Sequence, residues 1–215
     1  TTLLGPPRLA RDPLTQTHKD IAAAAQERLE QVVIRMVKRL VDETGLKKLC
    51  VAGGVAMNCK MNGVIGASGL VDGLFVQPAA HDSGTALGAA LWVSARSGAD
   101  PRFKMDHAQW GPGYSSAEVE KAARITGMRF ERPDSIEEKT AAALADGKVV
   151  AWFHGRMEVG PRALGGRSIL AHPALPGMND RVNRDVKFRD AWRPFCPSML
   201  ESAAADYLQP ALETR

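Results

Sequence analysis

Residues 46–58 read LKKLCVAGGVAMN, in which a short apolar run is followed by two glycines, Gly53 and Gly54. An apolar run of this length, closed by turn residues, predicts a buried strand that ends at Gly53 and Gly54. A second run, LFVQP at residues 74–78, predicts another strand, and a polar helix start is expected between them over residues 58–65. Strands and helices that alternate in this way are typical of an α/β layered fold.

Helices are expected on both sides of this pair of strands. Apolar residues recur on one helical face between residues 20 and 41, and Gly45 is a plausible C-terminal stop. After the second strand, the small residues of positions 84–95 predict a helix packed closely against a sheet. Glycine, proline and serine then cluster, which predicts a linker over residues 97–115.

The second half of the chain repeats the mixture of helix and strand. Ser116 is expected to cap a helix that ends before Gly127, and Ser135 to cap a helix over 136–145. MRFER at 128–132 predicts a strand, and VVAWF at 149–153 a buried strand. The expected domains are therefore residues 1–96 and 116–215, joined by the linker.

Composition places the chain among globular proteins. It has 215 residues, 45% of them hydrophobic and 24% charged, and a net charge of +4, so any strong positive field must be local. Cys50, Cys59 and Cys196 lack metal-ligand spacing and are expected to be buried free thiols in a reducing compartment. No apolar run is long enough to span a membrane and no secretory signal is present, which predicts a cytoplasmic protein without a membrane partner.

Two short motifs follow the predicted strands of the first half. Gly53 and Gly54 could form a backbone nest for an anion, or only a tight turn. Asp82 stands before Ser83, at the expected start of a helix. Its carboxylate could cap that helix or offer an oxygen ligand to a metal.

A third motif, HGRMEVGPRALGGRSIL at 154–170, sets three arginines among glycines with a single acid, Glu158. The planar fork of arginine binds phosphate or carboxylate oxygens, and glycine lets an anion approach the backbone. Basic residues continue to Arg193, but from Asp180 to Asp190 they alternate with acids, where surface salt bridges are the alternative. A polyanionic small molecule is the expected ligand.

Nucleic acid is not an expected partner on this pattern. Its single strands are bound by aromatic side chains interleaved with basic residues. The candidates are Phe188, Trp192 and Phe195, which lie in FRDAWRPF, a segment expected to be partly buried.

Six segments resemble, in the same order, the nodulation-protein-U type carbamoyltransferases, a family that includes antibiotic-tailoring O-carbamoyltransferases. They are LLGPPR, DIAAAAQERLE, LCVAGGVAMNCKMNG, LFVQPAAHDSGTALGAAL, GRMEVGPRALGGRSIL and KFRDAWRPFCPSML. The resemblance implies the C-terminal part of an actin/Hsp70/sugar-kinase-like domain, followed by part of an α/β domain like threonylcarbamoyl-adenylate synthase. It also implies an internal piece of a longer enzyme, inactive by itself.

The resemblance further implies an ATP-dependent reaction in which carbamoyl phosphate, ATP and Mg²⁺ give a carbamoyl-adenylate, and the carbamoyl group then passes to an acceptor hydroxyl. It assigns catalytic contacts to Arg162, Arg167 and Lys187. Substrate or nucleotide contacts fall on Gly53, Gly54, Asn58, Arg156, Arg189 and Arg193.

Asp82 matches the family's metal-ligand aspartate, for Fe²⁺ or another divalent metal. The family's paired-histidine motif is not present, because the five histidines include no pair three or four residues apart. Two alternatives stay open: a nucleotide-binding module without catalysis and, more weakly, a nucleic-acid binder. No motif encodes the acceptor or the oligomeric state.

Overall fold

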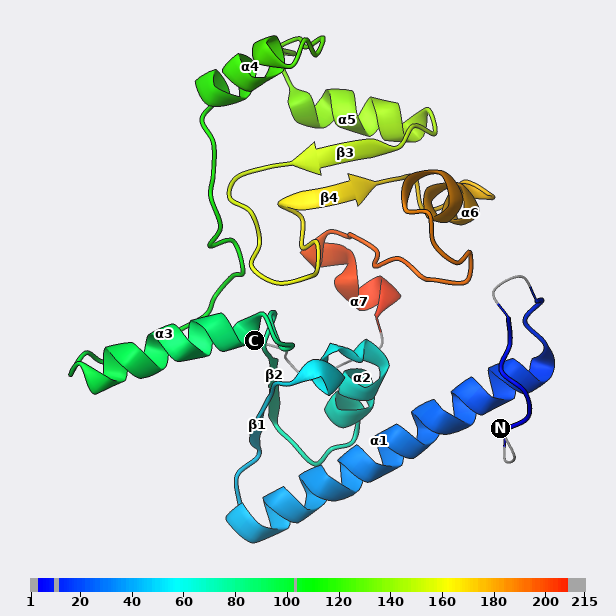
Figure 1. Cartoon of the computed structure of the whole chain (residues 1–215), viewed down its shortest axis with the longest axis vertical. Coiled ribbons are helices and arrows are strands. Elements are labelled where there is room, and N and C mark those ends of the chain that lie inside the picture. Colours follow the sequence, from blue (N-terminus) through cyan, green and yellow to red (C-terminus); the bar gives the residue numbers. More distant parts are fainter. Residues whose placement is uncertain (1–3, 10–11, 103, 209–215) are drawn as a thin grey trace. The chain divides into compact units, whose positions relative to one another are not determined.

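A computed structural model describes residues 4–9, 12–102 and 104–208 of the chain. It divides into two compact units, drawn in Figure 1. Unit 1 comprises the described residues up to Ala90 together with the segment from Ala205, and unit 2 comprises Leu91–Ala204. Helices and small sheets occur in both units, so the α/β class is confirmed.

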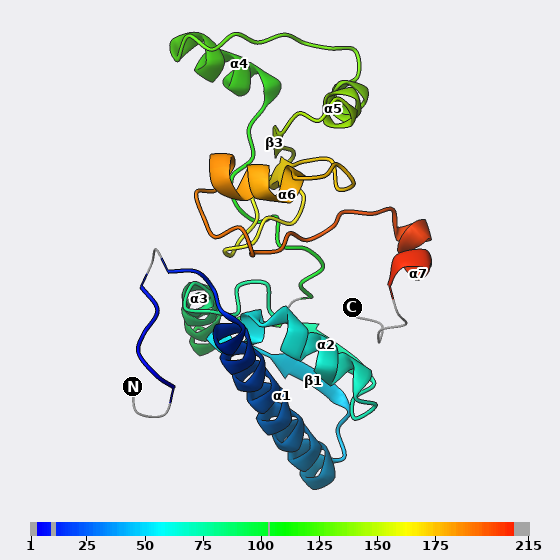
Figure 2. The ribbon, with the colours of Figure 1, turned by 90° about the vertical axis from the view of Figure 1, so that its right-hand side faces the viewer.

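Unit 1 is built on a parallel strand pair. Helix α1 (Gln16–Thr44) leads into strand β1 (Lys48–Val51), a 3₁₀ turn η1 (Gly54–Met57), helix α2 (Cys59–Ala67) and strand β2 (Gly73–Val76). Leu49 lies opposite Leu74 in the parallel pairing. Parallel strands need a crossover connection, and α2 supplies it, with α1 packed against α2 (Figures 1 and 2).

The core of unit 1 forms where these elements meet. Its buried members are Val37 of α1, Met61 and Ile65 of α2, and Val71 and Leu74 in and before β2. The predicted end of α1 is confirmed: Gly45 has φ +70°, and its N–H donates to the carbonyl of Val41 at 2.8 Å. This left-handed backbone is the usual way for a glycine to close a helix.

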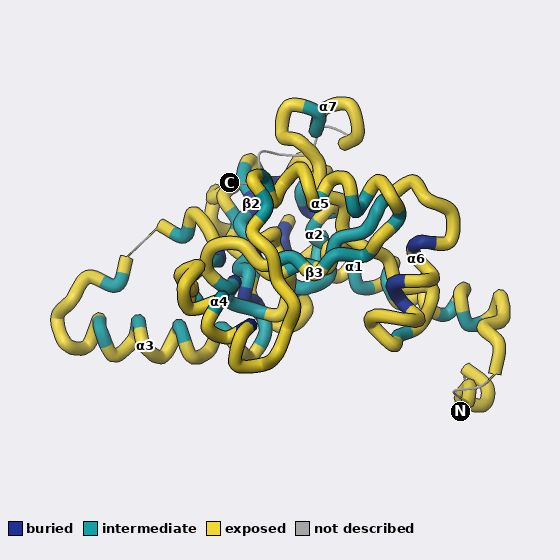
Figure 3. The backbone as a smooth tube through the Cα atoms, turned by 90° about the horizontal axis from the view of Figure 1, so that it is seen from above, coloured by how far each residue is buried: buried dark blue, intermediate teal, exposed yellow. Residues whose placement is uncertain are grey.

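The predicted burial of the strand that ends at Gly53 and Gly54 and of the strand at residues 149–153 is wrong. In β1, Leu49 and Val51 are half-buried while Lys48 and Cys50 are exposed, and the same alternation holds in β3 (Val150–Phe153). In β1 one face is turned to solvent, whereas β2 has no exposed residue. The expected burial of the cysteines is also wrong, since all three cysteines are exposed; Figure 3 shows how little of the chain is fully buried.

Helix α3 (Gly84–Arg96) has the predicted extent but not the predicted packing. None of its described residues is buried, and Trp92 is 65% exposed. Small side chains permit a close approach to a sheet without requiring one. No helix in the described ranges is long and apolar enough to cross a membrane.

Unit 2 contains helices α4 (Ser116–Ile125) and α5 (Ile136–Ala145), and an antiparallel pair of strands, β3 and β4 (Arg167–Leu170), with Phe153 opposite Arg167 (Figure 1). A short α6 (Met178–Arg181) continues into a π-helical turn η2 (Val182–Val186). A 3₁₀ turn η3 (Glu201–Ala203) and α7 (Ala204–Tyr207) end the described chain.

The helix caps of unit 2 follow the sequence closely. Ser135 caps α5 as predicted, and its Oγ accepts the N–H of Glu138 at 3.1 Å. For α4 the cap is Ser115 and not Ser116, because Glu118 lies three residues after Ser115 and completes a capping box with it.

The predicted strand at residues 128–132 is wrong. The segment has no regular secondary structure and pairs with no strand in the described chain. Its residues make side-chain contacts instead: Arg124 lies over the ring of Phe130 at 5.1 Å, and Arg132 forms an ion pair with Glu120. Alternation along the sequence does not distinguish this from a strand, because a strand also requires a partner.

Part of the predicted linker is hydrogen-bonded to other residues of unit 2, within which it lies. Met157 donates its N–H to the carbonyl of Pro112 at 3.0 Å and accepts the N–H of Gly111 at 2.9 Å, and Val159 donates to Ala108 at 2.7 Å. The segment 108–113 therefore lies along residues 156–159. The domain boundaries at 96 and 116 stay predictions.

Candidate functional site

The loops after β1 and β2 meet at the carboxyl ends of these parallel strands, where open α/β sheets bind ligands. Gly53 has φ +95° and donates its N–H to the carbonyl of Ala80 at 2.7 Å. That N–H is used within the protein, so Gly53 supplies the turn and the joint between the loops. Gly54 begins η1 and is exposed.

Asn58 has a structural role that the sequence did not reveal. Its Oδ1 accepts the N–H of Met61 at 3.0 Å and caps α2. The same side chain pairs with Gln26 of α1: Asn58 Nδ2 donates to Gln26 Oε1 at 2.7 Å, and Gln26 Nε2 donates to Asn58 Oδ1 at 3.2 Å. Asn58 thus joins α1 to α2.

Asp82 lies on the loop before α3 with its carboxylate exposed. Within the described chain, no hydrogen bond or ion pair engages that carboxylate; Thr85 Oγ1 donates instead to the Asp82 backbone carbonyl at 2.6 Å. The side chain is thus free to act as one oxygen ligand. The described residues hold no group of three or more His, Cys, Asp or Glu placed to bind a metal, so they do not complete a metal site.

The loop of residues 158–167, called here the Glu158–Arg167 loop, is organised by the acid that the sequence places among its glycines. The Glu158 side chain is buried, with 5% of the residue exposed. Its Oε1 accepts three backbone N–H groups: Leu164 at 3.0 Å, Gly166 at 2.6 Å and Arg167 at 3.0 Å. One carboxylate oxygen therefore fixes the second half of the loop.

The pKa of Glu158 reflects this environment. Burial raises the pKa of the Glu158 carboxyl. The backbone N–H groups of Leu164, Arg167 and Gly166 together lower it by more, so the pKa lies below its ordinary value of 4.5. Hydrogen bonds to the charged form of a carboxylate favour that form. Glu158 is therefore ionised at neutral pH despite its burial.

The three arginines of this motif divide into two kinds. Arg156 is tied to the backbone: its Nε donates to the carbonyl of Gly111 at 2.7 Å and its Nη2 to that of Trp110 at 3.0 Å. Arg162 and Arg167 are exposed, and in the described part of the chain no hydrogen bond or ion pair engages their guanidinium groups. These two are the arginines available to an anion.

The second basic segment, residues 187–193, is supported by Asn183. This side chain has no exposed surface; its Nδ2 donates to the carbonyls of Ala191 at 3.1 Å and Arg193 at 3.0 Å, and its Oδ1 accepts Arg189 Nε at 2.7 Å. Asn183 therefore sets the course of the loop after η2. Lys187 is exposed beside it.

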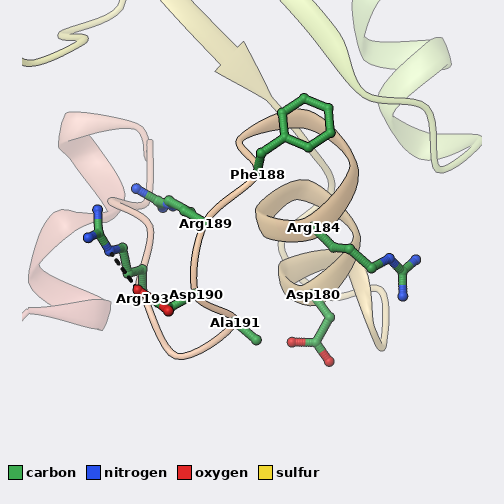
Figure 4. Close-up of a pocket in the computed structure, with 7 residues that line it drawn as sticks. All are labelled: Asp180, Arg184, Phe188, Arg189, Asp190, Ala191 and Arg193. Atoms are coloured by element: carbon green, nitrogen blue, oxygen red, sulfur yellow. Dashed lines mark ion pairs between the residues drawn. The ribbon is translucent and has the colours of Figure 1, made fainter. Parts of the chain in front are cut away.

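An open cavity of about 740 Å³ lies between this loop and the helical turn before it, shown in Figure 4. Arg189 and Arg193 line it, and Lys187 does not. Phe188 also lines it and has φ +47°, a strained backbone for a bulky residue. The other lining residues are Asp180, Arg184, Asp190 and Ala191.

Ion pairs account for part of the alternation of charges in this segment. Arg184 forms an ion pair with Asp185 at 2.6 Å, and Arg193 Nε lies 3.8 Å from Asp190. Surface salt bridges, the alternative for residues 180–190, thus occupy part of this segment. Arg162 and Arg167 have no such partners in the described chain, so they carry the stronger expectation of anion binding.

The aromatic residues of FRDAWRPF are not buried as predicted. Phe188 is 83% exposed, Trp192 63% and Phe195 39%. Arg193 lies over the Trp192 ring at 5.8 Å and Arg189 over the Phe195 ring at 4.8 Å. Cation–π contacts form between exposed side chains as well as buried ones. The argument against nucleic acid depended on burial of these rings, and their exposure removes it.

Fold and site together define an α/β protein with a glycine-rich loop that carries two exposed arginines, Arg162 and Arg167. Family models of the carbamoyltransferase N-terminus and C-terminus match residues 1–91 and 141–214, respectively. The chain belongs to the carbamoyltransferase family. The family resemblance seen in the sequence is confirmed.

Individual relatives agree with this family. Nodulation protein NolO of Bradyrhizobium diazoefficiens is 45% identical over 201 residues, which cover 92% of this chain and 37% of the relative. Nodulation protein NolNO of Sinorhizobium fredii is also 45% identical, over 92% of this chain and 30% of its own length. Nodulation protein U of Sinorhizobium fredii is 37% identical, over 89% and 33%. The chain thus spans about a third of the length of these relatives.

Proposed function

We propose that the chain is the central part of an ATP-dependent O-carbamoyltransferase. Carbamoyl phosphate, ATP and one water molecule would give carbamoyl-adenylate, phosphate and pyrophosphate, and an acceptor hydroxyl would then take the carbamoyl group, releasing AMP and a proton. Membership of the carbamoyltransferase family supports the transfer. The observation that carries the donor site is the pair of unpartnered arginines on the Glu158–Arg167 loop.

The chemistry expected of this loop is electrostatic. Phosphate oxygens of carbamoyl phosphate or ATP would accept hydrogen bonds from Arg162 and Arg167, with Lys187, Arg189 and Arg193 contributing further positive charge. Fixed donors aimed at developing charge lower a barrier without reorganising during the reaction. Mg²⁺, when bound with ATP, would neutralise phosphate charge.

The finer fold assignment is part of the same proposal. Unit 1 would belong to an actin/Hsp70/sugar-kinase-like domain that transfers the carbamoyl group, with Gly53, Gly54 and Asn58 near its nucleotide. Unit 2 would belong to a domain like threonylcarbamoyl-adenylate synthase. Asp82 would contribute one ligand to Fe²⁺ or another divalent metal.

The test replaces Arg162 or Arg167 by Ala in the full-length gene product. We expect pyrophosphate release that depends on carbamoyl phosphate to fall about 100-fold or more, as when a transition-state donor is removed. Arg129→Ala is the matched control, because Arg129 is an exposed arginine of unit 2 outside the site. Thermal unfolding should be unchanged in all three variants. Near-normal turnover in Arg162→Ala and Arg167→Ala would refute the assignment.

A second candidate, single-stranded nucleic-acid binding, is favoured by one observation, the exposed rings of Phe188, Trp192 and Phe195 beside arginines. Such binding falls steeply with salt, because phosphate contacts release counterions. Oligonucleotide affinity that drops by orders of magnitude between low and moderate salt would support it. Absence of binding at low salt would leave the carbamoyltransferase proposal alone.

A further inference from the structure

Glu158 is a buried acid in a loop whose other charged side chains, those of Arg162 and Arg167, are exposed and basic. Burial of an ionised carboxylate is unfavourable unless its charge is compensated. The compensation here comes from the backbone, since Oε1 accepts the N–H groups of Leu164, Gly166 and Arg167. The second oxygen, Oε2, is buried with no hydrogen-bond partner in the described chain. A buried oxygen without a partner lowers stability, so the three bonds to Oε1 must compensate for it as well.

The three donors lie in the second half of the loop. Arg167 supplies the last of them from its own backbone, and Arg162 precedes the first, Leu164, by two residues. The backbone of Arg167 is thus fixed directly by one oxygen, and Arg162 lies in the segment that is closed between Glu158 and Leu164. Hydrogen bonds to a charged acceptor are shorter and stronger than neutral ones, and fix the backbone correspondingly better.

Gly166 shows how closely the loop fits this carboxylate. A Cβ added there would lie 3.0 Å from the carbonyl oxygen of Arg156, 3.1 Å from Glu158 Oε1 and 3.2 Å from Gln109 Nε2. Gly166 is buried and its backbone needs no left-handed conformation. An added Cβ would force these neighbours to move by a few tenths of an ångström.

Charge alone would argue against an acid at this place. A negative charge near a phosphate site weakens anion binding by Coulomb repulsion. If Glu158 acted only through its charge, Glu158→Gln would tighten anion binding. If Glu158 acts by holding the loop, the same change would weaken it. The two roles therefore predict opposite signs.

We propose that Glu158 is a positioning residue, whose buried carboxylate sets the conformation in which the Glu158–Arg167 loop presents Arg162 and Arg167 to a phosphate-bearing ligand. The identity of that ligand as carbamoyl phosphate rests on the proposed function. The role of Glu158 in shaping the loop does not.

The experiment measures binding of carbamoyl phosphate and of inorganic phosphate to the full chain by calorimetry at low salt. Glu158→Gln should weaken binding of both about tenfold, since charge-assisted bonds to three N–H groups become neutral ones. Ser135→Ala is the matched control: it removes the cap of α5, lowers the melting temperature and should leave both affinities unchanged. Equal or tighter binding by Glu158→Gln would overturn the proposal.

Gly166→Ala is the second variant, used if Glu158→Gln does not fold. It keeps the charge but pushes against Glu158 Oε1, and it should also weaken both affinities. Unchanged affinities in Gly166→Ala would overturn the proposal by themselves.

Amide hydrogen exchange separates this proposal from the proposed function. Glu158→Gln should speed exchange at Leu164, Gly166 and Arg167 at least tenfold relative to Ser135→Ala. If the unaltered chain binds neither anion yet these amides lose protection, the proposed donor is wrong and the positioning role stands. If the unaltered chain binds and the amides keep their protection in Glu158→Gln, the positioning role is wrong.

Discussion

Asn183 links the buried interior of unit 2 to the basic loop around the cavity. Its amide makes three hydrogen bonds from a position with no exposed surface. Asn183→Ala would leave the carbonyls of Ala191 and Arg193 and the Nε of Arg189 without this partner. Removing one partner of a buried hydrogen bond costs about 1–3 kcal/mol. We expect a loss in this range in the free energy of unfolding, measured with urea.

Asn179→Ala is the control for this change, because Asn179 is an exposed asparagine on the neighbouring α6. Substitutions at such positions alter stability by about 0.5 kcal/mol or less. Equal stability of the Asn183 and Asn179 variants would contradict the structural role of Asn183.

Glu158 gives a prediction in pH. Its pKa is lowered in the folded protein, so its contribution to stability is present above pH 4.5 and is lost as pH falls through the folded pKa. In ¹H–¹⁵N spectra, the amide signals of Leu164, Gly166 and Arg167 should shift together as pH falls, with a midpoint below pH 4.5. Glu158→Gln should abolish this titration. A midpoint at or above 4.5 would show that the N–H groups do not hold the charged form.

At this scale, the sequence predicted the types of residue in the site better than their roles. The arginines among glycines stood out, but the sequence could not show that Arg156 binds the backbone of residues 110 and 111, whereas no described residue engages the guanidinium group of Arg162. The signal for Glu158 was present as the lone acid in a basic, glycine-rich motif. Its three donors lie six to nine residues later, where the loop folds back toward Glu158, and sequence spacing does not reveal that fold.

Helix ends offer a test at the scale of elements. Gly45 ends α1 with φ +70°, a backbone that costs an L-residue about 1 kcal/mol. Gly45→Ala should lower the free energy of unfolding by about this amount, measured by thermal unfolding. Gly63→Ala within α2, where an added Cβ has no atom within 4 Å, should instead be neutral or stabilising. Destabilisation of both variants alike would contradict the capping role.

Elements set by local signals were predicted well and those that depend on distant partners were not. Helices α1 and α5 follow from periodicity, a stop glycine and a capping serine, all within a few residues. The segment 128–132 has the composition of a strand, yet it found no partner strand in the described chain. The burial of β1 and β3 was overestimated because a short apolar run does not show how many faces of a sheet are covered.

For the whole molecule, the expected outcome is binding without turnover. The described chain presents Arg162 and Arg167 but does not complete a metal site around Asp82. The 215-residue chain should bind carbamoyl phosphate in calorimetry at low salt through these arginines and Lys187. It should not carbamoylate a hydroxyl acceptor, because transfer needs positioned groups from more of the protein than charge attraction does. Multiple turnovers by this chain alone would contradict the prediction.

The exposed thiols give the chain built-in attachment points for spectroscopic probes. Cys59 begins α2 in unit 1, and Cys196 follows the basic loop in unit 2. With Cys50 replaced by serine, spin labels on Cys59 and Cys196 would report the distance between one site in each unit. Distance distributions from such a pair, recorded with and without carbamoyl phosphate, would reveal whether the halves of the chain move when the anion binds.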